Sequence, residues 1–408
     1  MESIGYLIEP SVITSESYIE TIDDLDSELT EYFQHVIKVD HRLNRKLVSF
    51  QANKDRSAYR WYKFKEAFSA DLVEYLLYKY SIPKGRILDP FAGSGTALFA
   101  AADLGYDADG IEILPIAQQI IECRRFAAFE ISDTEKDILK LWRDSKPWKH
   151  VKTMKLLNEL RITEGAYPKE TAEEIGKFLI WLEQENGRIV NLLRFALFCV
   201  LESVSYTRKD GQFLRWDHRS GRGENNTFSK GKILSFDEAI TQKLNEVITD
   251  IENSNDRLND LLKNIEGVEK GDIQLNNNSC LEILTKLNSN LYNAVITSPP
   301  YCNRYDYTRT YALENALMGM TEEQQIDLRQ RMLSCTVESR TKELTAFNSS
   351  WTKAISICDT HSLLQQIIEY LEYQKKEGKL NNNGIPRMVK GYFYEMACVI
   401  QECWHCKK

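Results

Sequence analysis

Apolar and polar positions follow two patterns along this chain, and each pattern predicts one kind of secondary-structure element. Short apolar runs at 86–91, 107–113 and 292–298 end at proline or polar residues, which is typical of buried strands. Apolar residues spaced three or four apart predict helices over 69–80 and 96–105. Strands that alternate with helices indicate an α/β fold built on a parallel sheet.

The α/β rhythm is interrupted in the middle of the chain. From about residue 131 to 265 the pattern becomes mostly helical. The strand rhythm resumes at 271–277 and leads through a helical region over 311–375 to a final amphipathic helix over 392–404. We therefore predict an α/β domain that carries a large helical insertion. The predicted units are an N-terminal segment (1–58), a first α/β half (59–130), the insertion (131–265) and a second α/β half (266–408).

Composition narrows the class of protein. Apolar residues make up 43% of the 408 residues and charged residues 27%, which suits a chain with a sizeable core. No run approaches the roughly 18 apolar residues of a membrane span, and the acidic N-terminus does not resemble a secretory signal. We therefore expect a cytoplasmic protein without a membrane partner. The nine cysteines are scattered, which indicates reduced thiols. Cys403 and Cys406 form an isolated CxxC, and we predict no metal site.

The net charge of −8 does not indicate a nucleic-acid partner, because contacts to phosphates need Lys and Arg. A local basic cluster would nevertheless suffice. One such cluster lies at 205–226, where basic and aromatic residues are interleaved and three glycines favour a flexible loop or a hairpin. A second candidate, at 303–309, follows the strand at 292–298. The alternative interpretations are a solvated charged loop at 205–226 and helix-capping side chains at Asn303 and Asp306.

Residues 87–96, ILDPFAGSGT, place a tight Gly-x-Gly turn between a strand and a helix. Glycine is needed where a ligand approaches the backbone too closely for a Cβ atom. The turn has neither the GxGxxG pattern nor the Lys of a P-loop. Glu112 follows Gly93 by 19 residues, close to the spacing at which a carboxylate accepts hydrogen bonds from ribose hydroxyls. The pattern predicts a nucleoside-bearing cofactor; the alternative is an ordinary turn and an exposed Glu.

DPFAGSGT and the later string TSPPY, at 297–301, resemble the cofactor motif and the catalytic motif of DNA amino-methyltransferases. The resemblance covers about residues 60–125 and 270–400. It implies a Rossmann-like fold that binds S-adenosylmethionine and methylates an exocyclic amine in double-stranded DNA. Ser279 stands where the family usually has an acidic residue near the adenine. The cofactor contacts implied by the resemblance are Phe68, Ser69, Asp89, Phe91, Gly93, Gly95, Thr96, Glu112 and Ser279.

The TSPPY string suits the chemistry of an amine whose lone pair is delocalised into a ring. Ser298 offers a side-chain oxygen, and the carbonyl of Pro299 is a free acceptor that the fixed φ of proline holds in place. Such acceptors stabilise positive charge as it develops on nitrogen. Tyr301 supplies a face on which a flipped base can stack. We predict catalytic roles for Ser298, Pro299, Pro300 and Tyr301; the alternative is a strand that ends in a polyproline-like turn.

The resemblance also bears on substrate and setting. Family members with Ser at the first position of this tetrapeptide are more often cytosine-N4 enzymes, so Ser298 favours cytosine N4. The implied setting is a prokaryotic restriction-modification system with a cognate restriction endonuclease. The alternatives are adenine-N6 or RNA methylation, and a non-catalytic DNA-binding subunit. The predicted DNA contacts are Arg208, Lys209, Arg215, Trp216, Arg219, Arg304, Tyr305 and Arg309.

Under this resemblance, residues 59–130 form the cofactor-binding half, 131–265 the DNA-contacting or target-recognition insertion, and 266–408 the catalytic half. Enzymes of this family continue beyond the helix predicted at 392–404 with a strand, a glycine turn and a hairpin. We therefore expect that the sheet lacks its last strands through C-terminal truncation, or that a complementing C-terminal chain supplies them; the alternative to these two cases is that the helices are placed differently from this prediction. Either case predicts an exposed apolar sheet edge.

Overall fold

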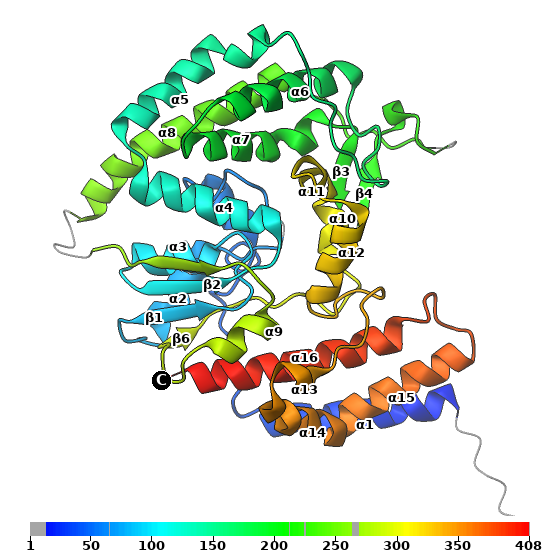
Figure 1. Ribbon diagram of the computed structural model, residues 1–408. Helices are drawn as coiled ribbons and strands as arrows, with labels where there is room; N and C mark the ends of the chain where they lie inside the picture. Colours follow the sequence, from blue (N-terminus) through cyan, green and yellow to red (C-terminus); the bar gives the residue numbers. More distant parts are fainter. Residues whose placement is uncertain (1–13, 65, 212, 224–225, 263–268, 408) are drawn as a thin grey trace, which may run out of the picture.

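The computed structural model describes residues 14–64, 66–211, 213–223, 226–262 and 269–407 (Figure 1). Parts of all four predicted units lie outside this description. They are residues 1–13 of the N-terminal segment, residue 65 of the first α/β half, residues 212, 224–225 and 263–265 of the insertion, and residues 266–268 and 408 of the second α/β half.

A parallel four-stranded sheet carries both motifs. Its strands are β1 (Arg86–Asp89), β2 (Asp107–Ile111), β5 (Ile273–Asn276) and β6 (Ala294–Val295), in the order β5-β2-β1-β6. All three neighbouring pairs run parallel, so the carboxyl ends of the strands meet at one edge. The predicted α/β class with a parallel sheet is confirmed. The strand predicted over 292–298 is shorter than expected: β6 covers only Ala294 and Val295.

Helices cover both faces of the sheet. Ile87 of β1 packs with α2 (Ala70–Lys79) and α3 (Thr96–Asp103) on one face. The next residue, Leu88, faces the opposite side and packs with α9 (Cys280–Ile283) and the long C-terminal helix α16 (Ile385–Cys406). This alternation follows from the period of two along a strand, and burial on both faces explains why β1 is apolar throughout its middle.

The middle of the chain forms a helical layer above the sheet (Figure 1). Helix α7 lies inside this layer, and 11 of its 16 residues are buried. The layer shares one core with the segment around Trp61 and with Tyr311, so the insertion and the α/β part pack as a continuous body. The basic cluster folds as the hairpin β3–β4, as the loop-or-hairpin prediction allowed. The elements of this layer are α4 (Pro115–Arg125), α5 (Asp133–Ser145), α6 (Lys169–Gln184), α7 (Ile189–Val204), β3 (Thr207–Asp210), β4 (Phe213–Trp216) and α8 (Phe236–Leu262).

The chain after TSPPY crosses from the hairpin towards α16 through α10 and α12 (Figure 1). The N-terminal helix α1 packs on α15, where Tyr18 contacts the rings of Tyr370 and Tyr373. Among the described residues, every helix is too short or too polar to span a bilayer. The helices of this part are α1 (Ser15–Phe33), α10 (Tyr307–Thr310), α11 (Ala312–Leu317), α12 (Glu322–Arg331), α13 (Leu344–Phe347), α14 (Thr352–Thr360) and α15 (Ser362–Lys376).

Candidate active site

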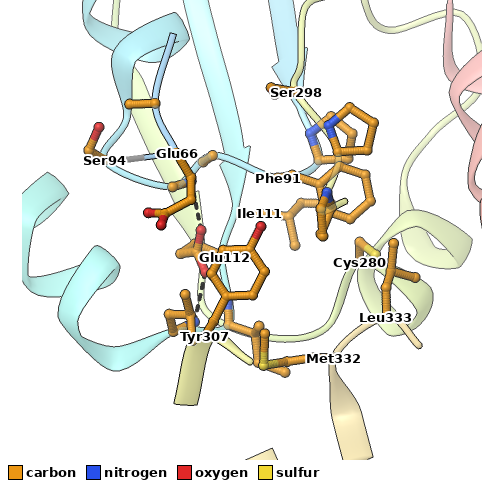
Figure 2. A pocket seen from close by; sticks show the side chains of 18 of the residues that line it. Glu66, Phe91, Ser94, Ile111, Glu112, Cys280, Ser298, Tyr307, Met332 and Leu333 are labelled. Atoms are coloured by element: carbon orange, nitrogen blue, oxygen red, sulfur yellow. Dashed lines mark hydrogen bonds between the residues drawn. The ribbon is translucent and has the colours of Figure 1, made fainter. Parts of the chain in front are cut away.

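The two sequence motifs meet at the carboxyl edge of the sheet, because β1 and β6 are neighbours there. A cavity opens between the turns that follow these strands (Figure 2). It encloses about 830 Å³ of empty space, its open mouth included. This volume falls within the roughly 300–1,000 Å³ of small-molecule sites. The predicted site residues that line the cavity are Phe68, Phe91, Gly93, Thr96, Glu112, Ser279, Ser298, Pro299, Pro300 and Tyr301.

Asp89 joins the two motifs from beneath the cavity. Its Oδ1 accepts hydrogen bonds from the Phe91 N–H (3.0 Å) and from the Thr297 hydroxyl (2.6 Å). Burial raises the pKa of this carboxyl group to about 6. Its Oδ2 is buried and has no hydrogen-bond donor among the described residues. Asp89 therefore aligns the two turns through Oδ1, while its Oδ2 is a buried acceptor without a hydrogen-bond donor among the described residues.

Glu112 directly follows β2 and lines the cavity (Figure 2). Its Oε2 accepts from the Gly93 N–H (2.6 Å), and its Oε1 accepts from the N–H groups of Ile113 (2.8 Å) and Leu114 (2.7 Å). Burial raises the pKa of Glu112 to about 7, although these N–H groups oppose the shift. The glycine turn thus holds a carboxyl group whose remaining lone pairs can accept from a ligand.

The two glycines of the turn have different surroundings. Gly93 lines the cavity with φ +52°, whereas Gly95 packs away from it with φ +75°. A Cβ atom on Gly95 would lie 2.8 Å from Cγ1 of Ile121, so Gly95 serves close packing and not ligand contact. Arg124 stabilises the same turn, because its Nη1 donates a hydrogen bond to the Ser94 carbonyl (3.0 Å).

Ser69 does not reach the cavity, although its neighbour Phe68 does. The Ser69 side chain is fully buried, and its oxygen accepts from the Leu72 N–H (3.1 Å) as the N-cap of α2. The same hydroxyl donates to the Leu47 carbonyl. Its position is therefore explained by helix capping, which the sequence also predicted.

All four residues Ser298, Pro299, Pro300 and Tyr301 of the TSPPY turn line the cavity. The Ser298 hydroxyl and the Pro299 carbonyl make no hydrogen bond with any residue that the structure describes. The Pro300 carbonyl, by contrast, accepts from the Tyr392 hydroxyl of α16 (2.7 Å). Tyr301 is 55% exposed at the mouth of the cavity. The turn is thus held by α16 at Pro300, whereas Tyr301 is open to solvent.

The cavity wall includes Tyr307, which belongs to the second candidate segment at 303–309, and also Glu66 and Met332, which the sequence did not single out. The ring of Tyr307 stands in the middle of the lining, with Met332 below it (Figure 2). The Glu66 carboxylate accepts hydrogen bonds from the hydroxyls of Tyr305 and Tyr311, the latter at 2.6 Å. The segment at 303–309 that the sequence singled out thus supplies part of this wall, whereas Met332 and Glu66 have no local pattern that marks them. Among the described residues, no cluster of His, Cys, Asp or Glu is arranged to hold a metal ion.

Two predicted DNA contacts are buried, and the structure corrects them. Lys209 of β3 is 5% exposed, and its Nζ lies 2.6 Å from Oε1 of Glu314 and 2.8 Å from the Tyr62 hydroxyl. Its side chain faces inward because alternate residues of a strand point to opposite faces. Tyr305 is 8% exposed, and its hydroxyl is bound to Glu66. Neither side chain reaches a surface on which DNA could lie.

The other predicted DNA contacts lie wholly or partly at the surface. Arg208 and Arg215 are exposed on the hairpin, and Arg215 stacks over the Phe228 ring at 4.0 Å. Arg215 also pairs with Asp210 (3.3 Å), and the remaining arginines have protein partners too. Arg219 pairs with Asp217, Arg304 donates to Asn381, and Arg309 donates to Glu338. Trp216 is half-buried beneath the guanidinium of Arg222, at 4.1 Å.

Known proteins resemble this chain over most of its length. A family model described as a DNA methylase matches residues 25–122. The type II methyltransferases M.AvaI of Nostoc sp. and of Anabaena variabilis are each 50% identical over 398 residues, which is 97% of this chain and 81% of theirs. M.BsoBI of Geobacillus stearothermophilus is 38% identical over 403 residues, covering 93% of this chain and 78% of its own. No solved structure matches.

Proposed function

Because this chain belongs to the type II DNA amino-methyltransferases, we propose that it methylates the N4 amine of cytosine in double-stranded DNA. The family uses S-adenosylmethionine as methyl donor and serves restriction-modification systems. The observation that carries the cytosine assignment is that a serine, Ser298, stands at the first position of the motif and lines the cavity beside Pro299. A cognate endonuclease, a cytoplasmic location and a chain that completes the sheet stay predictions.

The residues at the carboxyl edge fit S-adenosylmethionine. This molecule supplies a methyl group on a positively charged sulfur together with a ribose and an adenine. Glu112 has lone pairs left for ribose hydroxyls, and Gly93 leaves room at the backbone. The uncompensated oxygen of Asp89 and the carboxylate of Glu66 add negative charge around a cationic ligand. Because these residues fit the cofactor, we infer that the fold is Rossmann-like, both in the order of its strands and in binding its ligand at their carboxyl ends.

Two acceptors prepare the target amine for reaction. Ser298 Oγ and the Pro299 carbonyl each accept a hydrogen bond from one N–H group of the amine. These two hydrogen bonds localise the lone pair on the nitrogen and direct it at the methyl carbon. The amine nitrogen then forms a bond to that carbon as the carbon–sulfur bond breaks. Positive charge appears on nitrogen, where both acceptors stabilise it more than they stabilise the neutral amine. The surplus proton leaves to solvent.

A base inside a duplex cannot reach this cavity, so the target nucleotide must be flipped out of the stack. Tyr301 is exposed at the mouth and offers its ring to the flipped base. The exposed arginines of the hairpin, Arg208 and Arg215, are placed for phosphate contacts.

Product analysis tests this proposal. We would incubate the purified chain with unmethylated genomic DNA and labelled S-adenosylmethionine, digest the DNA to nucleosides and identify the labelled product by mass. N4-methylcytosine is the expected product. N6-methyladenine would overturn the cytosine assignment but not the enzyme class. A folded preparation that binds the cofactor yet labels no nucleoside would contradict the activity of this chain.

A further inference from the structure

A second hollow lies beside the catalytic cavity, on the other side of α10 and α12. We call it the arginine groove. Its defining residues are Arg161, Phe213, Trp216, Arg222, Arg309 and Arg329. It encloses about 1160 Å³, its wide opening included, between the hairpin β3–β4 and α12. None of these residues lines the catalytic cavity.

Two short helices separate the groove from the cavity. Tyr307 and Met332 line the cavity, whereas Arg309 and Arg329 line the groove. These pairs are only two and three residues apart, on α10 and at the end of α12. The wall is therefore about one helix thick, or roughly 10 Å. A DNA strand in the groove lies within reach of a base that occupies the cavity.

The charge in the groove is only partly compensated. Arg329 lies 2.9 Å from Asp306, and Arg309 lies 2.9 Å from Glu338. Arg161 and Arg222 have no carboxylate within ion-pair distance among the described residues. Glu322 also lines the groove, and its carboxylate accepts from the Arg161 backbone N–H (2.6 Å). The groove thus carries more positive than negative charge in a chain that is acidic as a whole.

Arg222 is fixed in place before any ligand arrives. Its guanidinium carbon lies over the Trp216 ring, 4.1 Å from the ring centroid, and its Nη2 donates to the Arg161 carbonyl (3.3 Å). Stacking uses the face of the guanidinium and leaves further N–H donors along its edge. A planar edge of this kind donates two parallel hydrogen bonds to a phosphate or to O6 and N7 of guanine.

We propose that the arginine groove binds the DNA strand, with Arg222 donating to a paired acceptor on it. The acceptor is a phosphate or the O6/N7 edge of a guanine. The proposal rests on the proposed function, and it adds Arg222 and Arg161 to the substrate contacts. Phe213, 57% exposed at the end of the hairpin, forms an apolar border of the same groove.

Binding to two labelled duplexes tests the proposal. One duplex carries a site mapped by sequencing plasmid DNA that the wild-type protein has methylated, and the other carries that site scrambled. Fluorescence anisotropy gives Kd across a salt series for wild type, Arg222→Ala, Arg222→Lys and Arg161→Ala. The matched control is Arg143→Ala, on α5 at the far side of the helical layer from the hairpin (Figure 1). Calorimetry with S-adenosylmethionine checks that each variant is folded.

We expect Arg222→Ala to weaken binding by about tenfold or more, and Arg143→Ala to change it by less than twofold. A loss on both duplexes, with a shallower salt dependence and partial rescue by Lys, identifies a phosphate. A loss confined to the site-bearing duplex, without rescue by Lys, identifies guanine. Wild-type Kd values for both folded Arg222 variants on both duplexes would overturn the groove assignment. A wild-type protein that binds cofactor but methylates no DNA would instead contradict the proposed function.

Discussion

At the scale of single residues, the proposed chemistry depends on one hydroxyl. Ser298 makes no hydrogen bond with the described residues, so removing its oxygen disturbs little of the protein's own structure. Replacing Ser298 by Ala is expected to lower the rate of methyl transfer by about tenfold to a hundredfold, because one acceptor for the developing charge is lost. Cofactor affinity should change by less than twofold. Single-turnover kinetics and calorimetry measure the two effects.

The control for Ser298 is Ser356→Ala, an exposed serine on α14 away from the cavity. It should match the wild-type protein in both measurements. A Ser298→Ala enzyme with an unchanged transfer rate would show that the hydroxyl does not contact the reacting amine.

Glu112 gives cofactor binding a pH dependence. Burial sets the pKa of this group at about 7, and ribose hydroxyls donate to its ionised form. Below pH 7 a proton must leave before the cofactor binds, so Kd should rise about tenfold per pH unit as the pH falls. Above pH 7 the contribution of Glu112 should level off. Calorimetry between pH 6 and 8.5 follows the curve. Glu112→Gln removes this contribution, and an identical pH profile in that variant would assign the titration to another group.

At the scale of elements, α16 holds the catalytic turn. The Tyr392 hydroxyl donates to the Pro300 carbonyl, while Tyr394, two residues on, donates to Asp359 of α14 (2.6 Å). Tyr392→Phe should lower kcat about fivefold, because a net hydrogen bond of about 1 kcal/mol no longer orders the turn. Tyr394→Phe should lower the midpoint of thermal unfolding and leave kcat unchanged. If Tyr392→Phe and Tyr394→Phe have the same kcat, the hydrogen bond from α16 to Pro300 does not contribute to catalysis.

The same scale shows what the sequence could predict. Strand β1, the glycine turn and the N-cap of α2 follow from patterns within about ten residues, and each was predicted correctly. The support that Tyr392 gives to Pro300 spans 92 residues, and the pairing of Lys209 with Glu314 spans 105. No local pattern encodes such contacts. In the sequence, Lys209 stands among arginines and so was predicted to be a surface cation. In the structure it is buried and belongs to the core.

At the scale of the whole molecule, that buried pair joins the hairpin β3–β4 to α11, and so joins the middle of the chain to the part that follows TSPPY. Lys209 and Glu314 are both almost fully buried. Replacing Lys209 by Met leaves a buried carboxylate without its cation and should lower the free energy of unfolding by about 3–5 kcal/mol. Urea titration measures the change. Lys209→Met combined with Glu314→Gln should recover part of the loss.

An exposed pair provides the reference for this experiment. Lys232 lies 2.7 Å from Glu238, with a side chain that is 70% exposed. Lys232→Met should cost less than about 1 kcal/mol, because solvent screens surface pairs. If Lys209→Met costs no more than Lys232→Met, the buried pair does not hold the two parts together.

The thin wall between the cavity and the arginine groove links two binding equilibria. Helix α10 places Tyr307 on one side and Arg309 on the other. A ligand that shifts this helix from the cavity side changes the free energy of occupying the groove. Linkage then requires that DNA alter the affinity for cofactor by the same factor as cofactor alters the affinity for DNA. The strength of the coupling between cofactor and DNA binding is therefore set by a helix four residues long.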